Sequence, residues 1–127
     1  MSRAFEAEHI DFGPDAQEGD ITVSERFWVP DAMLGRGMIT EAQYAAAKRY
    51  RDDYYAGRNN PSSVAQRAFQ AASKAVGDVL APALAWTVLS HGTVTGWAEC
   101  RGIEVAKAAV QVVQALERLN SFYGAKV

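Results

Sequence analysis

The sequence predicts an all-α protein, a compact bundle of about five helices. Apolar residues recur at the three- and four-residue spacing of a helix face, and no stretch alternates between apolar and polar residues as a half-buried strand does. Capping residues precede these periodic stretches and glycines follow them. With 127 residues, 49% of them hydrophobic, the chain is long enough to build one domain around its own core.

The first part of the chain differs from the rest in charge. Residues 1–38 hold three basic and eight acidic residues, a net charge of −5, whereas residues 39–127 hold ten basic and seven acidic residues, a net charge of +3. The stretch DFGPDAQEGD is rich in Asp and Gly and shows no apolar period. We therefore expect an acidic arm with little structure of its own over residues 1–26, followed by a helical domain over residues 27–127.

The domain is expected to begin with a short helix and a long one. The stretch FWVPDAMLGRG predicts a turn of helix after Pro30 that docks on the body and stops at the glycines. Thr40 is the expected N-cap of the long helix, with Gln43 completing a capping box, and Gly57 is the expected C-cap. The inner face of this helix is expected to hold Ala46, Ala47, Tyr50 and Tyr54.

A third helix is expected over SVAQRAFQAASKAV, after the loop RNNPSS. Either Asn60, which precedes a proline, or Ser63, with Gln66 three residues later, can begin it, and Gly77 ends it. The residues predicted to face inward are Val64, Ala68, Ala71, Ala72 and Ala75.

The next helix is expected over VLAPALAWTVLSHG. Asp78 is its expected N-cap, and Pro82 falls in the first turn, where its missing N–H costs little. The segment is apolar on nearly all sides, so we expect it to be the central buried helix. His91 and Gly92 end it, with His91 acting as a capping cation or as a polar group at the edge of the core.

The C-terminal stretch GWAECRGIEVAKAAVQVVQALERLNSFYG predicts a helix-turn-helix over residues 93–124. Thr93 or Thr95 caps a short helix, and Gly102 forms the turn after it. Glu104 is expected in the first turn of the last helix, where the helix dipole favours a carboxylate. The inner stripe of that helix is predicted to be Val105, Ala109, Val112, Val113, Leu116, Leu119 and Tyr123.

A second side of the last helix carries candidate contact residues. Four polar residues spaced 4, 3 and 4 positions apart share this side: Lys107, Gln111, Gln114 and Arg118. Lys and Arg reach phosphates or guanine, and Gln can bridge an adenine edge, as a recognition helix requires. An ordinary solvent-facing helix side shows the same residue types, so that interpretation stays open beside the first.

Position along the helix separates the expected roles of these residues. The start of a recognition helix is the part that reaches bases, which favours the group Glu104, Lys107, Ala108 and Gln111 for base contact. Arg101 is expected to clamp a phosphate at the turn, and Arg118 to serve a phosphate or a partner protein. The modest charge of residues 39–127 predicts that DNA binding by the chain alone is weak and sensitive to salt.

The sequence shows no catalytic or cofactor motif. His9 and His91 lie far apart without metal-ligand partners at a useful spacing, and there is no nucleotide-binding loop, CxxC motif or Ser-centred elbow. The single cysteine, Cys100, cannot form an internal disulfide. No apolar run reaches the ~20 residues of a membrane span, and the first residues lack the regions of a secretory signal. We therefore expect a cytoplasmic protein that is not an enzyme and uses no cofactor or metal.

Two stretches stand out together, AAAKRYRDDY, Ala45–Tyr54, and the later ECRGIEVAKAAVQVVQALERLNSFYG. They resemble a family of small helical domains found in alphaproteobacterial phages and prophages, and at the C-terminus of the transcriptional activator of gene transfer agents. The family pattern combines an Ala-x-x-Arg-x-Arg-x-Asp-aromatic run, a glycine turn, a long helix with ALxxL and a final YG. The matching residues here are Ala46, Arg49, Arg51, Asp53, Tyr54, Gly102, Ala115, Leu116, Leu119, Tyr123 and Gly124, and the resemblance covers about residues 27–124.

The resemblance implies a phage-type transcription regulator that acts through promoter DNA, a bacterial RNA polymerase subunit or both, with a helix-turn-helix similar to region 4 of a sigma factor. The family's last helix tends to carry more Arg and Lys, whereas Ala106, Ala109 and Val113 stand here at positions that are often basic. This departure favours contact with polymerase, or with DNA that polymerase already holds. Two alternatives stay open: a small-terminase-like DNA-packaging protein that forms a ring, and a protein-binding module that never touches DNA. The oligomeric state is not predicted.

Overall fold

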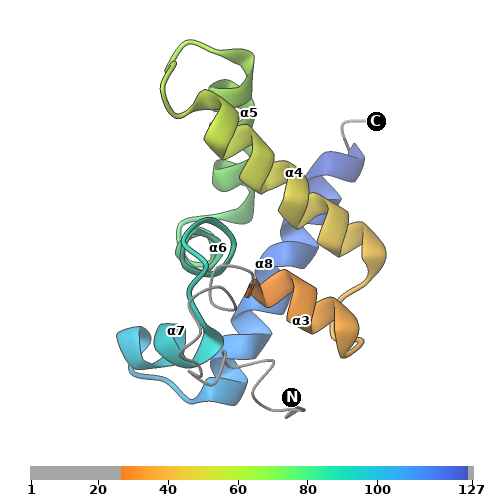
Figure 1. Ribbon diagram of the computed structural model, residues 1–127, viewed down its shortest axis with the longest axis vertical. Helices are drawn as coiled ribbons and strands as arrows, with labels where there is room; N and C mark the ends of the chain where they lie inside the picture. The colour runs from red at the N-terminus through yellow and green to blue at the C-terminus, as the bar shows by residue number, and fades with distance from the viewer. Residues whose placement is uncertain (1–26, 126–127) are drawn as a thin grey trace.

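The computed structural model of the chain describes residues 27–125, so the acidic arm expected over residues 1–26 lies outside the described residues. Every regular element in this described part is helical, which confirms the all-α prediction. None of the described helices combines the length and the apolar character that a membrane span requires. In chain order the elements are α3 (Val29–Gly35), α4 (Glu41–Gly57), α5 (Val64–Val76), α6 (Ala81–Leu84), the π-helical η2 (Ala85–Leu89), α7 (Val94–Arg101) and α8 (Val105–Ala125), drawn in Figure 1.

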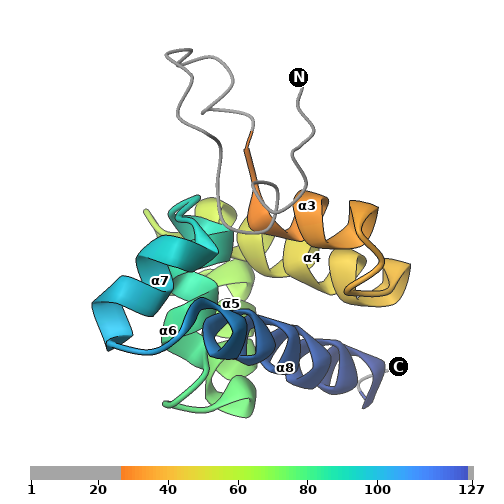
Figure 2. The same ribbon diagram turned by 90° about the horizontal axis from the view of Figure 1, so that it is seen from below.

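The last helix, α8, is the centre of the bundle. It packs against α4, α5, α6 and α7. Figure 2 shows α4 and α8 in separate layers, with α3 on the side of α4 that faces away from α8. Within the predicted inner stripe, Val105 and Val113 are half-buried and the other members are buried. The buried face of α8 consists of Ala108, Ala109, Val112, Ala115, Leu116, Leu119 and Tyr123.

The predicted caps are confirmed at the starts of three helices. The hydroxyl of Thr40 accepts the backbone N–H of Gln43 at 3.1 Å, and the Gln43 side chain accepts the N–H of Thr40 at 2.8 Å, which completes the capping box of α4. Ser63, rather than Asn60, is the N-cap of α5. Thr93, rather than Thr95, is the N-cap of α7.

The predicted inner face of α5 is wrong for Val64, Ala71 and Ala75 and is confirmed for Ala72. Val64 is 73% exposed, and Ala71 and Ala75 are exposed as well, whereas Ala72 and Val76 are buried. The side chains of α5 that pack on the core are Phe69, Ala72 and Val76. Aromatic packing against α4 explains this orientation. The centre of the Phe69 ring lies 4.8 Å from that of Tyr50 and 5.1 Å from that of Tyr54. This contact sets the rotation of α5 about its own axis.

The segment from Ala81 to Leu89 also differs from its prediction. It buries Ala83, Leu84, Thr87 and Val88 but exposes Pro82 and Ala85, so it covers one side of the core and is not the central helix. Its N-cap position is Leu80, and Asp78 does not cap it. Pro82 does lie in its first turn, as predicted.

Gly57 ends α4 for a reason other than the predicted one. The C-cap is Arg58 in right-handed helical conformation, so no left-handed glycine closes the helix. Gly57 is instead buried, and a Cβ built on it would lie 2.5 Å from the backbone nitrogen of Gln66. Close approach between α4 and the first turn of α5 therefore requires a glycine here.

Candidate contact surface

The segment from Thr93 to the start of α8 forms a capped helix, a glycine turn and a second helix. The Thr93 hydroxyl accepts the backbone N–H of Gly96 at 2.9 Å and begins α7, which is 8 residues long. Gly102 has φ 68° and ψ 37°, the left-handed conformation that reverses the chain. Glu104 precedes α8 instead of lying in its first turn, and its carbonyl accepts the N–H of Ala108 at 2.9 Å. A short connection of this kind, with glycine, is typical of helix-turn-helix units.

The start of this unit is held by a tryptophan that sequence reasoning missed. The indole of Trp86 in η2 donates to the carbonyl oxygen of Thr93 at 2.9 Å. Its ring lies so close to Gly92 and Gly96 that a Cβ on Gly92 would stand 2.3 Å from the Trp86 nitrogen. Trp86 also approaches Trp97, with ring centres 6.1 Å apart. The sequence does contain a pattern that indicates this contact: Gly92 and Gly96 flank the N-cap Thr93, a few residues after Trp86.

Trp97 engages two of the six predicted contact residues. Its indole Nε1 donates to the side-chain oxygen of Gln111 at 3.0 Å, and Gln111 is half-buried. The guanidinium of Arg101 stands 5.3 Å from the centre of the Trp97 ring, a cation–π distance. Arg101 is nevertheless exposed beside the turn, so its remaining donors face solvent.

Arg118 lies away from the turn and is tied to another helix. Its Nη1 donates to the carbonyl oxygen of Val76, the last residue of α5, at 3.0 Å. Arg118 also lines an open hollow between α5 and α8 together with Ala75, Glu117, Ser121 and Phe122. A cation at a helix C-terminus is electrostatically favourable, so the first role of Arg118 in the structure is to close α5.

The remaining predicted residues lie just before α8 and on the exposed side of its first three turns. Glu104, Lys107 and Gln114 are exposed, and they share this side of the helix with Val110, which is 52% exposed. Ala108, which sequence reasoning grouped with the base-contacting positions, is wrong in that role because its side chain is completely buried. The surface near the turn is therefore Arg101, Glu104, Lys107, Val110 and Gln114.

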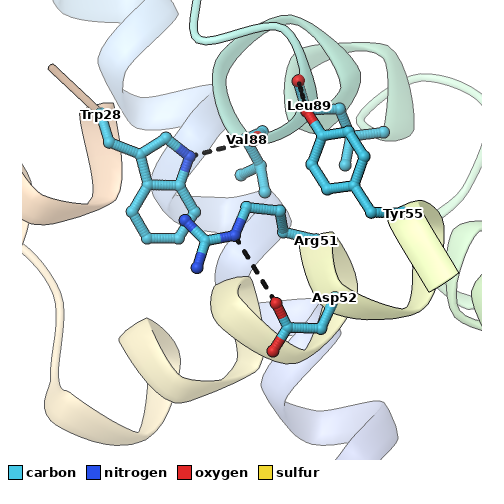
Figure 3. A network of polar contacts seen from close by, with 6 residues as sticks. All are labelled: Trp28, Arg51, Asp52, Tyr55, Val88 and Leu89. Carbon is cyan, nitrogen blue, oxygen red and sulfur yellow. Dashed lines mark hydrogen bonds and ion pairs between the residues drawn. The ribbon is translucent and has the colours of Figure 1, made fainter. Parts of the chain in front are cut away.

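The arginines of the Ala-x-x-Arg-x-Arg-x-Asp run lie over aromatic rings of neighbouring segments, with Arg49 exposed and Arg51 half-buried. The guanidinium of Arg49 lies 4.3 Å from the centre of the Tyr123 ring, and that of Arg51 lies 4.3 Å from the centre of the Trp28 ring. Arg51 also pairs with the exposed Asp52, with its Nε 3.8 Å from a carboxylate oxygen (Figure 3). These contacts join α4 to α8 and to the N-cap of α3, so the two arginines cover the edge of the core with their side chains.

Side chains from α3 and α4 also close the π-helical segment. Trp28 Nε1 donates to the carbonyl oxygen of Val88 and the Tyr55 hydroxyl donates to that of Leu89, both at 2.9 Å (Figure 3). The last carbonyls of a helix lack partners within it, so these bonds satisfy groups that would otherwise need water. His91, just beyond, is exposed at the edge of the core, and its Nδ1 lies 3.2 Å from the carbonyl oxygen of Phe27.

Two titratable groups lie between α4 and α8. Burial is the main cause that raises the pKa of Asp53, and the Arg49 guanidinium opposes the shift. Burial also raises the pKa of the Tyr123 hydroxyl, followed by the negative charge of Asp53. The Tyr123 hydroxyl and Asp53 Oδ2 are both buried without a hydrogen-bond partner among the described residues.

No protein-family model, curated protein or solved structure matches this chain.

Proposed function

We propose that the protein is a phage-type transcription regulator that acts through promoter DNA, a subunit of bacterial RNA polymerase or both, with the α7–α8 unit as its contact surface. The observation that carries this proposal is the left-handed Gly102 between a capped 8-residue helix and a long helix whose first two turns expose Lys107. Arg101 beside the turn and Gln114 further along α8 extend the polar surface.

The same surface limits what α8 can read. The oxygen of Gln111 already accepts the Trp97 indole N–H, which holds the half-buried amide against α7 and leaves one lone pair of that oxygen for a base edge. Lys107 and Gln114 are left for base edges or phosphates. Direct base reading by α8 alone is therefore sparse, and the proposal needs polymerase or a second DNA contact to supply affinity.

The second candidate function is binding to a protein, and Val110 is the residue that favours it. It is 52% exposed in the same part of α8 as Lys107 and Gln114. An exposed aliphatic side chain framed by polar ones suits a protein interface better than a phosphate backbone. In this candidate, the α7–α8 surface docks on a polymerase subunit and DNA is not touched.

Binding to purified components separates the two candidates. Binding of a labelled promoter-length duplex and of purified bacterial RNA polymerase is measured for the full chain, for Lys107→Ala/Gln114→Ala and for Val110→Ser. Lys48→Ala, which removes an exposed cation from α4, is the control. The proposal expects the α8 double variant to lose binding and the control to keep it. Polymerase binding without DNA binding, lost in Val110→Ser, supports the protein-binding candidate.

Two outcomes would overturn the proposal. If the α8 variants bind DNA and polymerase as well as the parent chain does, the α7–α8 unit is not the contact surface. If light scattering finds a stable ring of many chains, the DNA-packaging alternative takes its place.

A further inference from the structure

The tip of the α4–α5 pair and the outer side of α5 form a basic surface far from the α7–α8 turn. Between Tyr54 and Gly77 the chain contains no Asp or Glu but has three cations, Arg58, Arg67 and Lys74. Figure 1 shows the α4–α5 connection at one end of the long axis of the molecule and the α7–α8 turn near the other. The two surfaces can therefore be altered separately.

The rotation of α5 aims its polar residues outward. Arg67 and Lys74 are seven positions apart, which is two helical turns or about 10 Å along the axis. They lie on the same side of α5, with the exposed Gln70 between them, because Ala72 and Val76 occupy the buried side. We call Arg58, Arg67, Gln70 and Lys74 the α5 face.

Contacts within the fold position the two arginines of this face. The Arg67 guanidinium donates to the carbonyl oxygen of Ser62, and the Arg58 guanidinium stands 5.1 Å from the centre of the Tyr55 ring. Tyr55 is itself fixed by its bond to Leu89. Each guanidinium has five N–H donors, so most donors stay free for an external acceptor while the side chain is held near the surface.

The row of positive charge continues to the C-terminal end of α5. Arg118 of α8 donates there to Val76, and its Nη1 lies 3.5 Å from the position of a Cβ on Gly77. Glu117 lines the adjacent hollow beside Ala75 and offsets part of this charge. The positive charge of this surface is therefore least offset by carboxylates near Arg58 and Arg67.

We propose that the α5 face binds the phosphate backbone of duplex DNA without reading sequence. The inference rests on the proposed function in requiring DNA as a partner, and it supplies the second contact that the sparse α8 surface needs. Duplex DNA carries a negative charge about every 1.7 Å of its axis, so cations about 10 Å apart meet phosphates in any sequence. Arg, Lys, Ser, Asn and Gln are the residue types that contact phosphates, and Asn59, Asn60 and Ser62 at the tip add to them.

The composition of the face argues against a protein partner. Stable protein interfaces have an apolar or aromatic centre surrounded by a polar rim. On α5 the order is reversed, because the centre is Gln70 between two cations and the exposed Val64 lies at the N-terminal edge of the helix. The positive charge of the α5 face therefore favours a polyanion over a protein as its partner.

A matched pair of lysine variants tests the inference. Lys74→Gln and Lys48→Gln each remove one exposed lysine from a helix, the first from the α5 face and the second from α4. Affinity for two duplexes of unrelated sequence is measured by fluorescence anisotropy at several salt concentrations, with the full chain. We expect Lys74→Gln, and not Lys48→Gln, to reduce the slope of log affinity against log salt by about 0.9 on both duplexes. Arg67→Gln/Lys74→Gln should reduce it by about 1.8, with circular dichroism confirming that the fold is kept.

Each other result has a defined meaning. Equal effects of Lys74→Gln and Lys48→Gln overturn the inference, because they show a response to total charge only. No DNA binding by the full chain at low salt overturns it too, while polymerase binding can still support the proposed function. Loss of DNA binding in Lys107→Ala/Gln114→Ala with no effect of the α5 variants leaves the proposed function standing and the α5 face excluded.

Discussion

Trp97 and Gln111 are joined across the Gly102 turn, by a hydrogen bond of 3.0 Å from the indole Nε1 to the side-chain oxygen. The bond fixes the short helix α7 on the first turns of α8. It also gives Gln111 a structural role at the position where sequence spacing predicted a contact with DNA or a partner. This bond therefore stabilises the arrangement of α7 on α8. It also engages Gln111, one of the side chains expected to contact a partner.

Replacing Gln111 tests that structural role. Gln111→Ala leaves the N–H of the buried Trp97 without its acceptor, so we expect the free energy of unfolding to fall by about 1 kcal/mol. Gln114→Ala, at an exposed position one helical turn further on, should change it by less than about 0.5 kcal/mol. Urea denaturation of the two variants measures the difference. Equal stabilities would mean that the bond contributes nothing.

Gly102 is expected to tolerate substitution poorly because of its backbone conformation alone. At φ 68° a Cβ costs about 1 kcal/mol or more, and more for a β-branched residue, although nothing lies within 4 Å of the Cβ position. Gly102→Val should therefore lower the melting temperature, and Gly102→Asn should recover most of the loss, because Asn accepts this conformation. Similar melting temperatures for the two variants would contradict the explanation.

Gly57 is expected to resist substitution for the opposite reason. Its Cβ would lie 2.5 Å from the Gln66 nitrogen and 2.7 Å from the Gln66 Cα, both of them backbone atoms that can move only with the helix. We expect Gly57→Ala to cost about 1–3 kcal/mol of unfolding free energy, as overpacking does. Gly35→Ala, where nothing lies within 4 Å, is the control and should be close to neutral by thermal denaturation. A neutral Gly57→Ala would show that α4 and α5 are less closely packed.

Two buried tyrosines should respond differently to loss of the hydroxyl. Tyr50 shares a hydrogen bond of 2.6 Å with the Ser73 hydroxyl, so Tyr50→Phe should cost about 1 kcal/mol. The Tyr123 hydroxyl has no partner among the described residues, so Tyr123→Phe should leave stability unchanged or increase it. Chemical denaturation compares them. A larger loss in Tyr123→Phe than in Tyr50→Phe would reveal a partner for Tyr123.

Asp53 should make stability depend on pH in the acidic range. Burial raises its pKa above the ordinary value of 3.8, so the folded state holds the proton more tightly than the unfolded state does. Stability then falls as the pH rises from that value through the raised pKa. Asp53→Asn removes this dependence, so its stability relative to the parent should increase with pH across the same window. Denaturation at a series of pH values measures this, with Asp78→Asn, at an exposed position outside α4, as the control. The same pH profile for both variants would exclude the effect of burial.

The sequence by itself determined the fold class and most helix boundaries. Local chemistry does this, because Thr40 with Gln43, Ser63 and Thr93 satisfy the first N–H groups of their helices from within a few residues. Gly102 was predictable for the same reason, since a left-handed turn depends on one residue. Helical spacing also identified most of the buried side of α8.

Only the tertiary structure decided how these helices meet and which polar side chains stay free. Phe69 against Tyr50 and Tyr54 sets the rotation of α5, and this contact joins two different helices, so spacing within α5 alone does not reveal it. Trp97 and Gln111 are 14 residues apart, and Arg118 and Val76 are 42 apart, so no local pattern could join them. The long-range hydrogen bonds reduced the predicted contact side of α8, and the packing of α5 left Arg67 and Lys74 exposed on its outer side.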